Sequence, residues 1–314
     1  MKNNIKIDNN FKKVLIIGAN GFLGTHLLQF RNEKEILDQN LFLIASDLKK
    51  DYINHEIPFY YIDITDKEKT IKKIIELSPQ IIILSAAMTN VDQCEIDKTL
   101  ATKINVEGSK NVIAACRRIK SKLVFLSTDF IFDGTKENGA YLESDIPNPL
   151  SHYGKTKYEA EKAIINSGIV YLICRTAVLY GWNKRQLNFI TWILSKLKDN
   201  EKISIVTNQI NSPTFVRNLA EILLKLIEKD VKGIYHTAGD CILNRYEIAV
   251  KCSDIFNYNK DLITPIPTLK QKALRPENAG LDISKLKKLI GSELKIYNLE
   301  EGLKDMKEQM IFNK

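Results

Sequence analysis

The segment PNPLSHYGKTKYEAE (147–161) places Tyr153 and Lys157 four residues apart near the start of a predicted helix. Side chains with this spacing lie on the same helix face. A tyrosine hydroxyl can protonate a carbonyl oxygen while a hydride reaches the carbonyl carbon, but its ordinary pKa is about 10. A neighbouring ammonium stabilises the tyrosinate and lowers that pKa. The pair therefore indicates acid catalysis of a carbonyl reduction, although a packed tyrosine beside a solvated lysine would have the same spacing.

A glycine-rich loop, GANGFLG (18–24), follows an apolar run and opens a predicted helix. In such a loop Gly18 permits a tight turn, Gly21 lets the backbone approach a pyrophosphate, and Gly24 allows the helix to pack closely on the strand. The unpaired N–H groups of the helix start, around Phe22 and Leu23, would face the phosphates. This strand–loop–helix context predicts a dinucleotide site rather than a glycine-rich turn without a ligand.

Two carboxylates end the next two apolar runs. Asp47 can accept hydrogen bonds from the adenosine ribose hydroxyls, and its charge disfavours a 2′-phosphate, so NADH is favoured over NADPH. Lys49 and Lys50 follow directly and could offset that repulsion. Asp63 could reach the adenine amino group, with an ordinary loop carboxylate as the close alternative.

A short polar stretch follows the fifth apolar run. Ser127, Thr128 and Asp129 of STDFIFDG (127–134) fall at a carboxyl end of the predicted sheet, where open α/β folds bind ligands. The Thr128 hydroxyl could hydrogen-bond a substrate carbonyl. The alternative is a turn without a catalytic role, which these residue types also favour. Together with Tyr153, Lys157 and the glycine loop, Thr128 completes a constellation with defined chemical roles.

The elements that must position these residues alternate along the first half of the chain. Apolar runs at 13–18, 41–47, 58–63, 80–86, 122–127 and 169–175 are separated by helical patterns, including 22–37 and 66–77, the latter with Thr65 as its expected cap. Continuously apolar runs are typical of parallel strands covered on both faces. The pattern predicts an α/β fold with a doubly wound, Rossmann-like parallel sheet.

The pattern loosens after Arg175. Helices are expected at 187–198 and 215–229, and GIYHTAG (233–239) is expected to form one more buried strand. We therefore predict a dinucleotide-binding domain over 1–175, to which 213–239 returns, and a smaller C-terminal α/β substrate-binding portion over 176–314.

Composition limits the other classes of function. The net charge of +8 comes from lysines scattered among acidic residues, which favours a solvated surface and an anionic small substrate over nucleic acid. The five cysteines have no CxxC spacing, so neither a disulfide framework nor a metal site is expected, and a reducing cytoplasm fits best. No apolar run is long enough to cross a membrane.

Nine segments in order resemble the extended short-chain dehydrogenase/reductases, and among these the dTDP-4-dehydrorhamnose reductase family. They are GANGFLG (18–24), AAMTNVDQCE (86–95), INVEG (104–108), STDFIFDG (127–134), YLESDIPNPLSHYGKTKYEAE (141–161), RTAVLYG (175–181), NQINSPTF (208–215), YHTAG (235–239) and RPENAGLD (275–282). The resemblance implies an NADH- or NADPH-dependent reductase of the 4-keto group of a nucleotide-linked 6-deoxy sugar. A nucleotide-sugar epimerase, an epimerase/reductase and a non-catalytic cofactor-binding regulatory subunit are the alternatives, and a homodimer is an option.

The resemblance also carries residue roles onto this sequence. It implies catalytic roles for Tyr153, Lys157 and Thr128. It implies cofactor contacts from Gly18, Gly21, Phe22, Leu23, Gly24, Asp47, Asp63, Ile64, Ala87, Met88, Thr89, Tyr153 and Lys157. It implies substrate contacts from Thr128, Asp129, Val178 and Arg275. Two positions depart from the family: Val178 stands where a tryptophan is usual, and Ser212 where a glycine is usual, which leaves the identity of the sugar open.

Overall fold

The computed structural model describes residues 11–30, 41–51, 56–136, 140–183 and 187–312. Its strands are β1 (Lys12–Ile17), β2 (Leu41–Asp47), β3 (Phe59–Tyr61), β4 (Ile81–Leu84), β5 (Lys122–Thr128), β6 (Tyr171–Thr176), β7 (Leu179–Tyr180), β8 (Ile203–Val206), β9 (Ile210–Asn211), β10 (Thr214–Phe215), β11 (Gly233–His236), β12 (Leu243–Asn244) and β13 (Ile263–Ile266). Its α-helices are α1 (Phe22–Gln29), α2 (Lys67–Leu77), α3 (Val91–Ile96), α4 (Lys98–Thr102), α5 (Ser109–Ile119), α6 (His152–Ile165), α7 (Phe189–Lys198), α8 (Val216–Glu228), α9 (Arg245–Phe256), α10 (Ser284–Ile290) and α11 (Leu299–Phe312).

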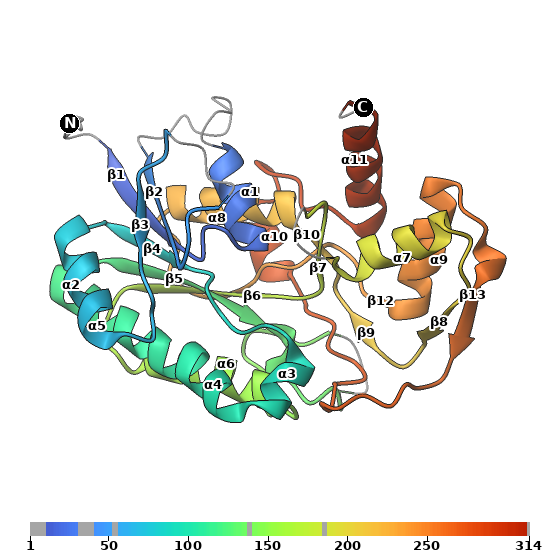
Figure 1. Ribbon diagram of the computed structural model, residues 1–314, viewed down its shortest axis with the longest axis horizontal. Coiled ribbons are helices and arrows are strands. Elements are labelled where there is room, and N and C mark those ends of the chain that lie inside the picture. The colour runs from blue at the N-terminus through green and yellow to red at the C-terminus, as the bar shows by residue number, and fades with distance from the viewer. Residues whose placement is uncertain (1–10, 31–40, 52–55, 137–139, 184–186, 313–314) are drawn as a thin grey trace.

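Seven strands form one parallel sheet in the order β11-β6-β5-β4-β1-β2-β3. The chain runs outward from β1 to β3, then crosses back to β4 and continues outward to β6 on the other side. This reversal between β1 and β4 is the point at which open α/β sheets bind ligands. The predicted α/β class with a doubly wound parallel sheet is confirmed (Figure 1).

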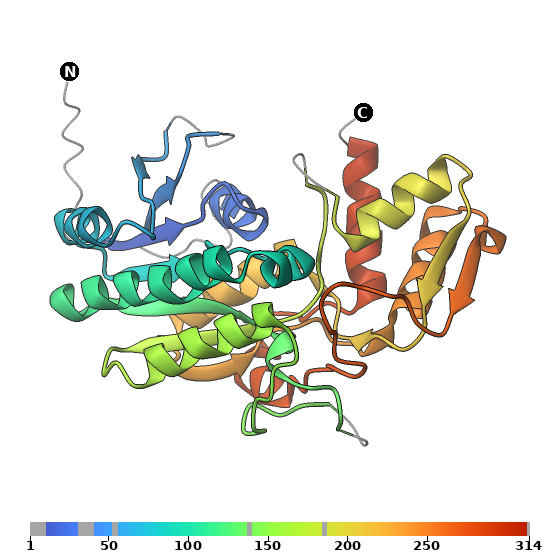
Figure 2. The ribbon, with the colours of Figure 1, turned by 60° about the horizontal axis from the view of Figure 1, so that its bottom comes forward.

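Apolar side chains cover both faces of the sheet, which explains the continuously apolar strands. In β1, Val14 and Ile16 join one buried cluster, whereas Leu15 and Ile17 join the other. Residues of α1, α8 and α10 pack in the first cluster, and residues of α2, α5 and α6 pack in the second. Figure 2 shows these two helical layers on opposite sides of the strands.

A smaller lobe lies beside the carboxyl ends of the central strands (Figure 1). It has its own buried cluster, built around α7, α9 and α11, and contains the strand pairs β8–β13 and β9–β12. Between these segments the chain returns to the large sheet, because α8 packs against the sheet core and β11 pairs with β6.

Three local features differ from the sequence expectations or add to them. Asp66, not Thr65, caps α2, because its carboxylate accepts from the Lys69 N–H. The helix expected over 22–37 ends at Gln29, and residues 31–40 lie outside the described part. A π-helical turn, η2 (Lys103–Gly108), joins α4 to α5. Such turns are frequent at functional sites.

Among the helices that the structure describes, none combines the length and apolar composition needed to cross a bilayer. All five cysteines are free thiols.

Candidate active site

The glycine loop between β1 and α1 is a tight backbone cradle. Gly18 has φ +92°, a conformation that favours glycine, and its N–H and that of Ala19 both donate to the Ser46 carbonyl at 3.0 Å. A Cβ added at Gly24 would lie only 2.7 Å from the Ala19 Cα. Helix α1 therefore packs directly against the loop, and only glycine permits this approach.

The start of α1 leaves its first N–H groups without a side-chain cap, because its N-cap residue is Gly21. Gly21 is exposed, Phe22 is half-buried, and Leu23 is buried in the core beneath. A helix N-terminus of this kind attracts anionic groups. The loop, its exposed surface and the free helix start together fit the pyrophosphate of a dinucleotide.

Asp47 connects the end of β2 to this loop. One carboxylate oxygen accepts from the Asn20 N–H at 2.9 Å and the other from the Leu48 N–H at 2.7 Å. The Asn20 side chain donates in turn to the Lys49 carbonyl. Each oxygen of Asp47 therefore keeps acceptor capacity for ribose hydroxyls. Asn20 lies within the glycine motif, but nothing in the sequence indicates that it would bond to Asp47.

Asp63 and Ile64 follow β3. One Asp63 oxygen accepts from the N–H and the hydroxyl of Thr65, at 2.9 and 2.8 Å. Ile64 is buried, and its carbonyl accepts from the Asn111 side chain at 2.8 Å. The carboxylate is thus part of an exposed local turn that also faces solvent.

The loop after β4, which contains Ala87, Met88 and Thr89, is held by a side chain that the sequence argument missed. Asn105 is buried in η2, accepts from the Met88 N–H at 2.8 Å and donates to the Met88 carbonyl at 3.1 Å. It also donates to the Thr156 hydroxyl at 3.0 Å. The segment INVEG was noted in the sequence, but its pattern did not indicate that Asn105 would fix this loop.

We expect Asn105→Ala to weaken binding of the nicotinamide cofactor about tenfold and to destabilise the fold by roughly 1–3 kcal/mol, because two partly buried backbone groups of Met88 lose their partners. Titration of the cofactor and urea unfolding measure the two effects. Asn105→Asp keeps the acceptor for the Met88 N–H and should retain part of both. Equal cofactor affinity in the wild type and Asn105→Ala would contradict a positioning role.

Tyr153 and Lys157 lie on the inner face of α6, which begins at the side-chain cap of Ser151. Tyr153 is 9% exposed and packs edge-on against Phe130, with ring centroids 5.8 Å apart. Burial raises the pKa of Tyr153, and the Thr128 hydroxyl opposes that rise. The Lys157 ammonium lies 4.0 Å from the centroid of the Phe125 ring. Burial lowers the pKa of Lys157 to about 7.

Thr128 ends β5, and Asp129 follows it at the carboxyl edge of the sheet. The Thr128 hydroxyl donates to Asp129 at 3.1 Å and accepts from the Phe130 N–H at 3.2 Å. The other Asp129 oxygen accepts from the Asn211 side chain at 2.9 Å. Burial raises the pKa of Asp129 to about 6. The structure therefore brings Thr128 and Tyr153 together, with Asp129 directly behind Thr128 and Lys157 one helical turn beyond Tyr153.

The other residues assigned to the substrate lie farther along the chain. Arg275 forms a two-pronged ion pair with Asp92 of α3, at 3.0 and 3.2 Å. Val178 is half-buried and has φ +43°, which is strained for a β-branched residue. Ser212, where the family usually has glycine, accepts from the Leu281 N–H at 3.1 Å.

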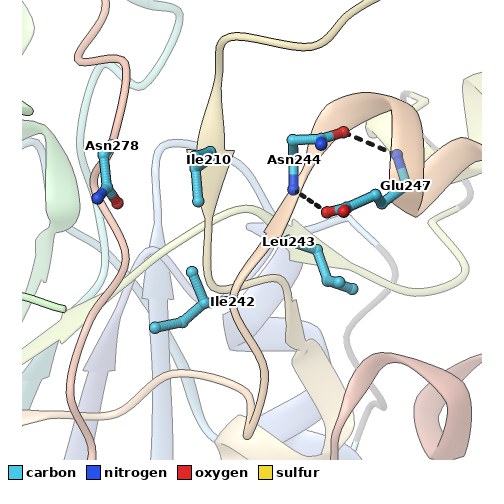
Figure 3. A pocket seen from close by; sticks show the side chains of 6 residues that line it. All are labelled: Ile210, Ile242, Leu243, Asn244, Glu247 and Asn278. Carbon is cyan, nitrogen blue, oxygen red and sulfur yellow. Dashed lines mark hydrogen bonds between the residues drawn. The ribbon is translucent and has the colours of Figure 1, made fainter. Parts of the chain in front are cut away.

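A cavity of about 350 Å³ opens on the smaller lobe. Figure 3 shows its lining side chains, which are Ile210, Ile242, Leu243, Asn244, Glu247 and Asn278. Asn244 and Glu247 cap the start of α9 by reciprocal hydrogen bonds. Because Ile210 precedes Asn211, which bonds Asp129, the cavity adjoins the polar edge of the sheet.

The sequence matches the family described as RmlD substrate binding domain over residues 12–311. It is 31% identical to a dTDP-4-dehydrorhamnose reductase of Aggregatibacter actinomycetemcomitans over 292 residues, which cover 89% of this chain and 93% of that protein. It is 32% identical to methionine adenosyltransferase 2 subunit beta of Rattus norvegicus over 288 residues, with 88% and 82% coverage.

A solved structure supports the same relationship. The dTDP-4-dehydrorhamnose reductase of Bacillus anthracis in complex with NADP superposes with a TM-score of 0.80 at 31% identity, covering 95% of this chain and 99% of that one. The match to the family extends over nearly the whole chain. The chain therefore belongs to the RmlD substrate binding domain family.

Proposed function

We propose that this protein is an NAD(P)H-dependent reductase of the 4-keto group of a nucleotide-linked 6-deoxy sugar, similar to the dTDP-4-dehydrorhamnose reductases. The observation that carries the proposal is the contact between Thr128 and Tyr153 at the carboxyl end of β5, with Lys157 one helical turn farther along α6. A bound reduced nicotinamide would supply the hydride.

The residues then divide the remaining work. Tyr153 donates a proton to the keto oxygen, and Lys157 stabilises the tyrosinate that results. The Thr128 hydroxyl, which donates to Asp129 in the free protein, would turn to donate to the same oxygen and keep it next to the Tyr153 hydroxyl. Asp129, buried behind Thr128, holds that hydroxyl until the sugar binds and would then lie next to the sugar.

The two parts of the chain would have different roles. Residues 1–175 with 213–239 would bind the cofactor, and 176–314 would mainly bind the sugar nucleotide, with Val178 and Arg275 on that side. A cytoplasmic location fits the free thiols, and a homodimer is part of the proposal.

The test is oxidation of NADH and NADPH, followed at 340 nm, against dTDP-, UDP- and GDP-linked 4-keto-6-deoxy sugars. We expect at least one of these compounds to react with kcat/KM of about 10⁴ M⁻¹s⁻¹ or more. A folded protein that binds cofactor but reduces none of them would contradict the proposal.

The second candidate is a cofactor-binding regulatory subunit, because a methionine adenosyltransferase beta subunit is as similar in sequence as the reductase. Fold alone does not distinguish these functions. An epimerase or epimerase/reductase is the third, and it would retain tightly bound cofactor through purification. Absorbance of the purified protein at 260 and 340 nm, together with the substrate panel, separates the three.

Asp47 supplies a prediction about cofactor choice. A 2′-phosphate would meet its negative charge, so we expect the wild type to prefer NADH and Asp47→Ala to narrow the NADH/NADPH ratio of kcat/KM, on the order of tenfold. Asp47→Asn, which keeps the size and removes the charge, is the matched control and should narrow it similarly. A wild type that prefers NADPH would instead mean that Lys49 or Lys50, not Asp47, sets the choice of cofactor.

A further inference from the structure

A buried ion pair lies one helical turn after Lys157, between α6 and β6. Glu161 is fully buried, and the Arg175 guanidinium donates two hydrogen bonds to its carboxylate, from Nε to Oε1 at 3.1 Å and from Nη2 to Oε2 at 2.8 Å. Arg175 also donates to the Glu143 carbonyl at 3.2 Å and lies over the Phe132 ring. The carboxylate therefore has a fixed position between α6 and β6.

Glu161 follows Lys157 by one helical turn, as Lys157 follows Tyr153, so the three side chains share one face of α6. Lys157 is 4% exposed, and within the described residues no carboxylate lies at ion-pair distance from its ammonium. The Phe125 ring of β5 covers the ammonium from one side. A buried cation in such a site needs a compensating charge nearby.

The charged and titratable groups around the face of α6 that carries Tyr153, Lys157 and Glu161 come from four elements. Tyr153 and Glu161 lie on its own helix, and Arg175 lies on β6. Asp129 follows β5, and Cys94 lies on α3 next to Tyr153. Of these groups, Glu161 is the one whose charge acts on the pKa of Lys157, raising it against the stronger lowering effect of burial.

We propose that the Glu161–Arg175 pair is a positioning pair for catalysis, in which Arg175 fixes the Glu161 carboxylate one helical turn from Lys157 so that its charge favours the protonated form of Lys157. The inference rests on the proposed function for the role of Lys157, but not for the charge coupling itself. Arg175 has two opposing effects, since it holds the carboxylate in place and also partly neutralises it.

Replacing Glu161 and replacing Arg175 should then shift the pH at which Lys157 loses its proton in opposite directions. Glu161→Gln deletes the supporting charge and leaves a bare guanidinium nearby, so Lys157 should lose its proton at lower pH, by about one pH unit. Arg175→Gln leaves the carboxylate unneutralised, so Lys157 should keep its proton to higher pH. A merely structural pair would lower stability in both variants without moving the titration in opposite directions.

The readout is the ¹⁵N resonance of the Lys157 side chain, assigned with Lys157→Arg and titrated in the free protein. The alkaline limb of the kcat/KM profile should move by the same amount as the resonance. Asp230→Asn, which breaks the Lys122–Asp230 pair at the amino end of β5, is the matched control and should leave both unchanged.

A double variant, Glu161→Met with Arg175→Met, carries the test if the single variants do not fold, because apolar replacement of a whole buried pair is often tolerated. Lys157 should again lose its proton at lower pH, since the net effect of the pair favours its charged form. Unchanged titration in the double variant, or shifts of the same sign in both single variants, would overturn the inference. Opposite shifts without turnover of any sugar would instead count against the proposed function alone.

Discussion

Tyr153→Phe is expected to lower kcat by roughly 10²–10⁴, the usual cost of losing a general acid. The change removes one oxygen and keeps the ring, so the edge-on contact with Phe130 and the packing against Cys94 and Ala101 should remain. Cofactor affinity should change little. Stopped-flow single turnover with a saturating 4-keto sugar measures the chemical step directly.

Tyr158→Phe is the matched control for this prediction. Tyr158 is on the same helix but packs against a different buried cluster from the one that contains Tyr153, so kcat should stay at the wild-type value. A folded Tyr153→Phe protein with turnover near that of the wild type would remove Tyr153 from the acid role. The next donor to test would be Thr128, since its hydroxyl lies beside the phenol.

The sheet could be predicted from sequence because its cause is local. Each central strand is apolar at successive positions, as in β4 (Ile81–Leu84), since the two faces bury alternate side chains. The end of each strand is therefore also visible, and with it the polar edge that carries Asp47, Thr128 and Asp129. The order of these ends along the chain placed the candidate residues at one edge, and their roles remain predictions.

The side chains that hold the site together could not be predicted in the same way. Asn105 reaches back to Met88, and Arg275 bonds Asp92 from a segment 183 residues later, so neither partner is defined by periodicity or spacing. The sequence does not distinguish Glu161 from the other polar residues of its helix, because only the tertiary fold buries it against Arg175. The predicted cap of α2, Thr65, was wrong by one residue, because Thr and Asp both favour the N-cap position and Asp66 occupies it.

Strain at Val178 was equally invisible in the sequence. A residue type alone does not reveal a left-handed backbone, and valine is among the least suited to it. The conformation occurs between β6 and β7, where the Val178 carbonyl accepts from the Thr214 N–H at 3.1 Å. The departure from the family's usual tryptophan thus falls on a backbone that is fixed by the neighbouring strand pair.

Lys157→Met is expected to abolish most of the turnover and yet stabilise the fold near neutral pH. The pKa of Lys157 is about 7 in the folded protein, against about 10.4 in an unfolded chain. Between these two values the unfolded chain binds a proton that the folded protein does not. Wild-type stability should therefore fall as the pH drops from about 10 to 7, by up to roughly 1.4 kcal/mol per pH unit from this group.

Methionine removes that titration while keeping a similar unbranched chain over Phe125. The gain in the free energy of unfolding should be on the order of a few kcal/mol at pH 7 and should vanish near pH 10. Urea unfolding from pH 6 to 10 measures it, with Lys162→Met, an exposed lysine on the same helix, as the control without a pH-dependent gain. A gain that is the same at pH 7 and pH 10 would mean that better packing, not the burial of a charge, accounts for the stabilisation. A gain confined to the neutral range would identify Lys157 as a destabilising group retained for the chemistry it supports.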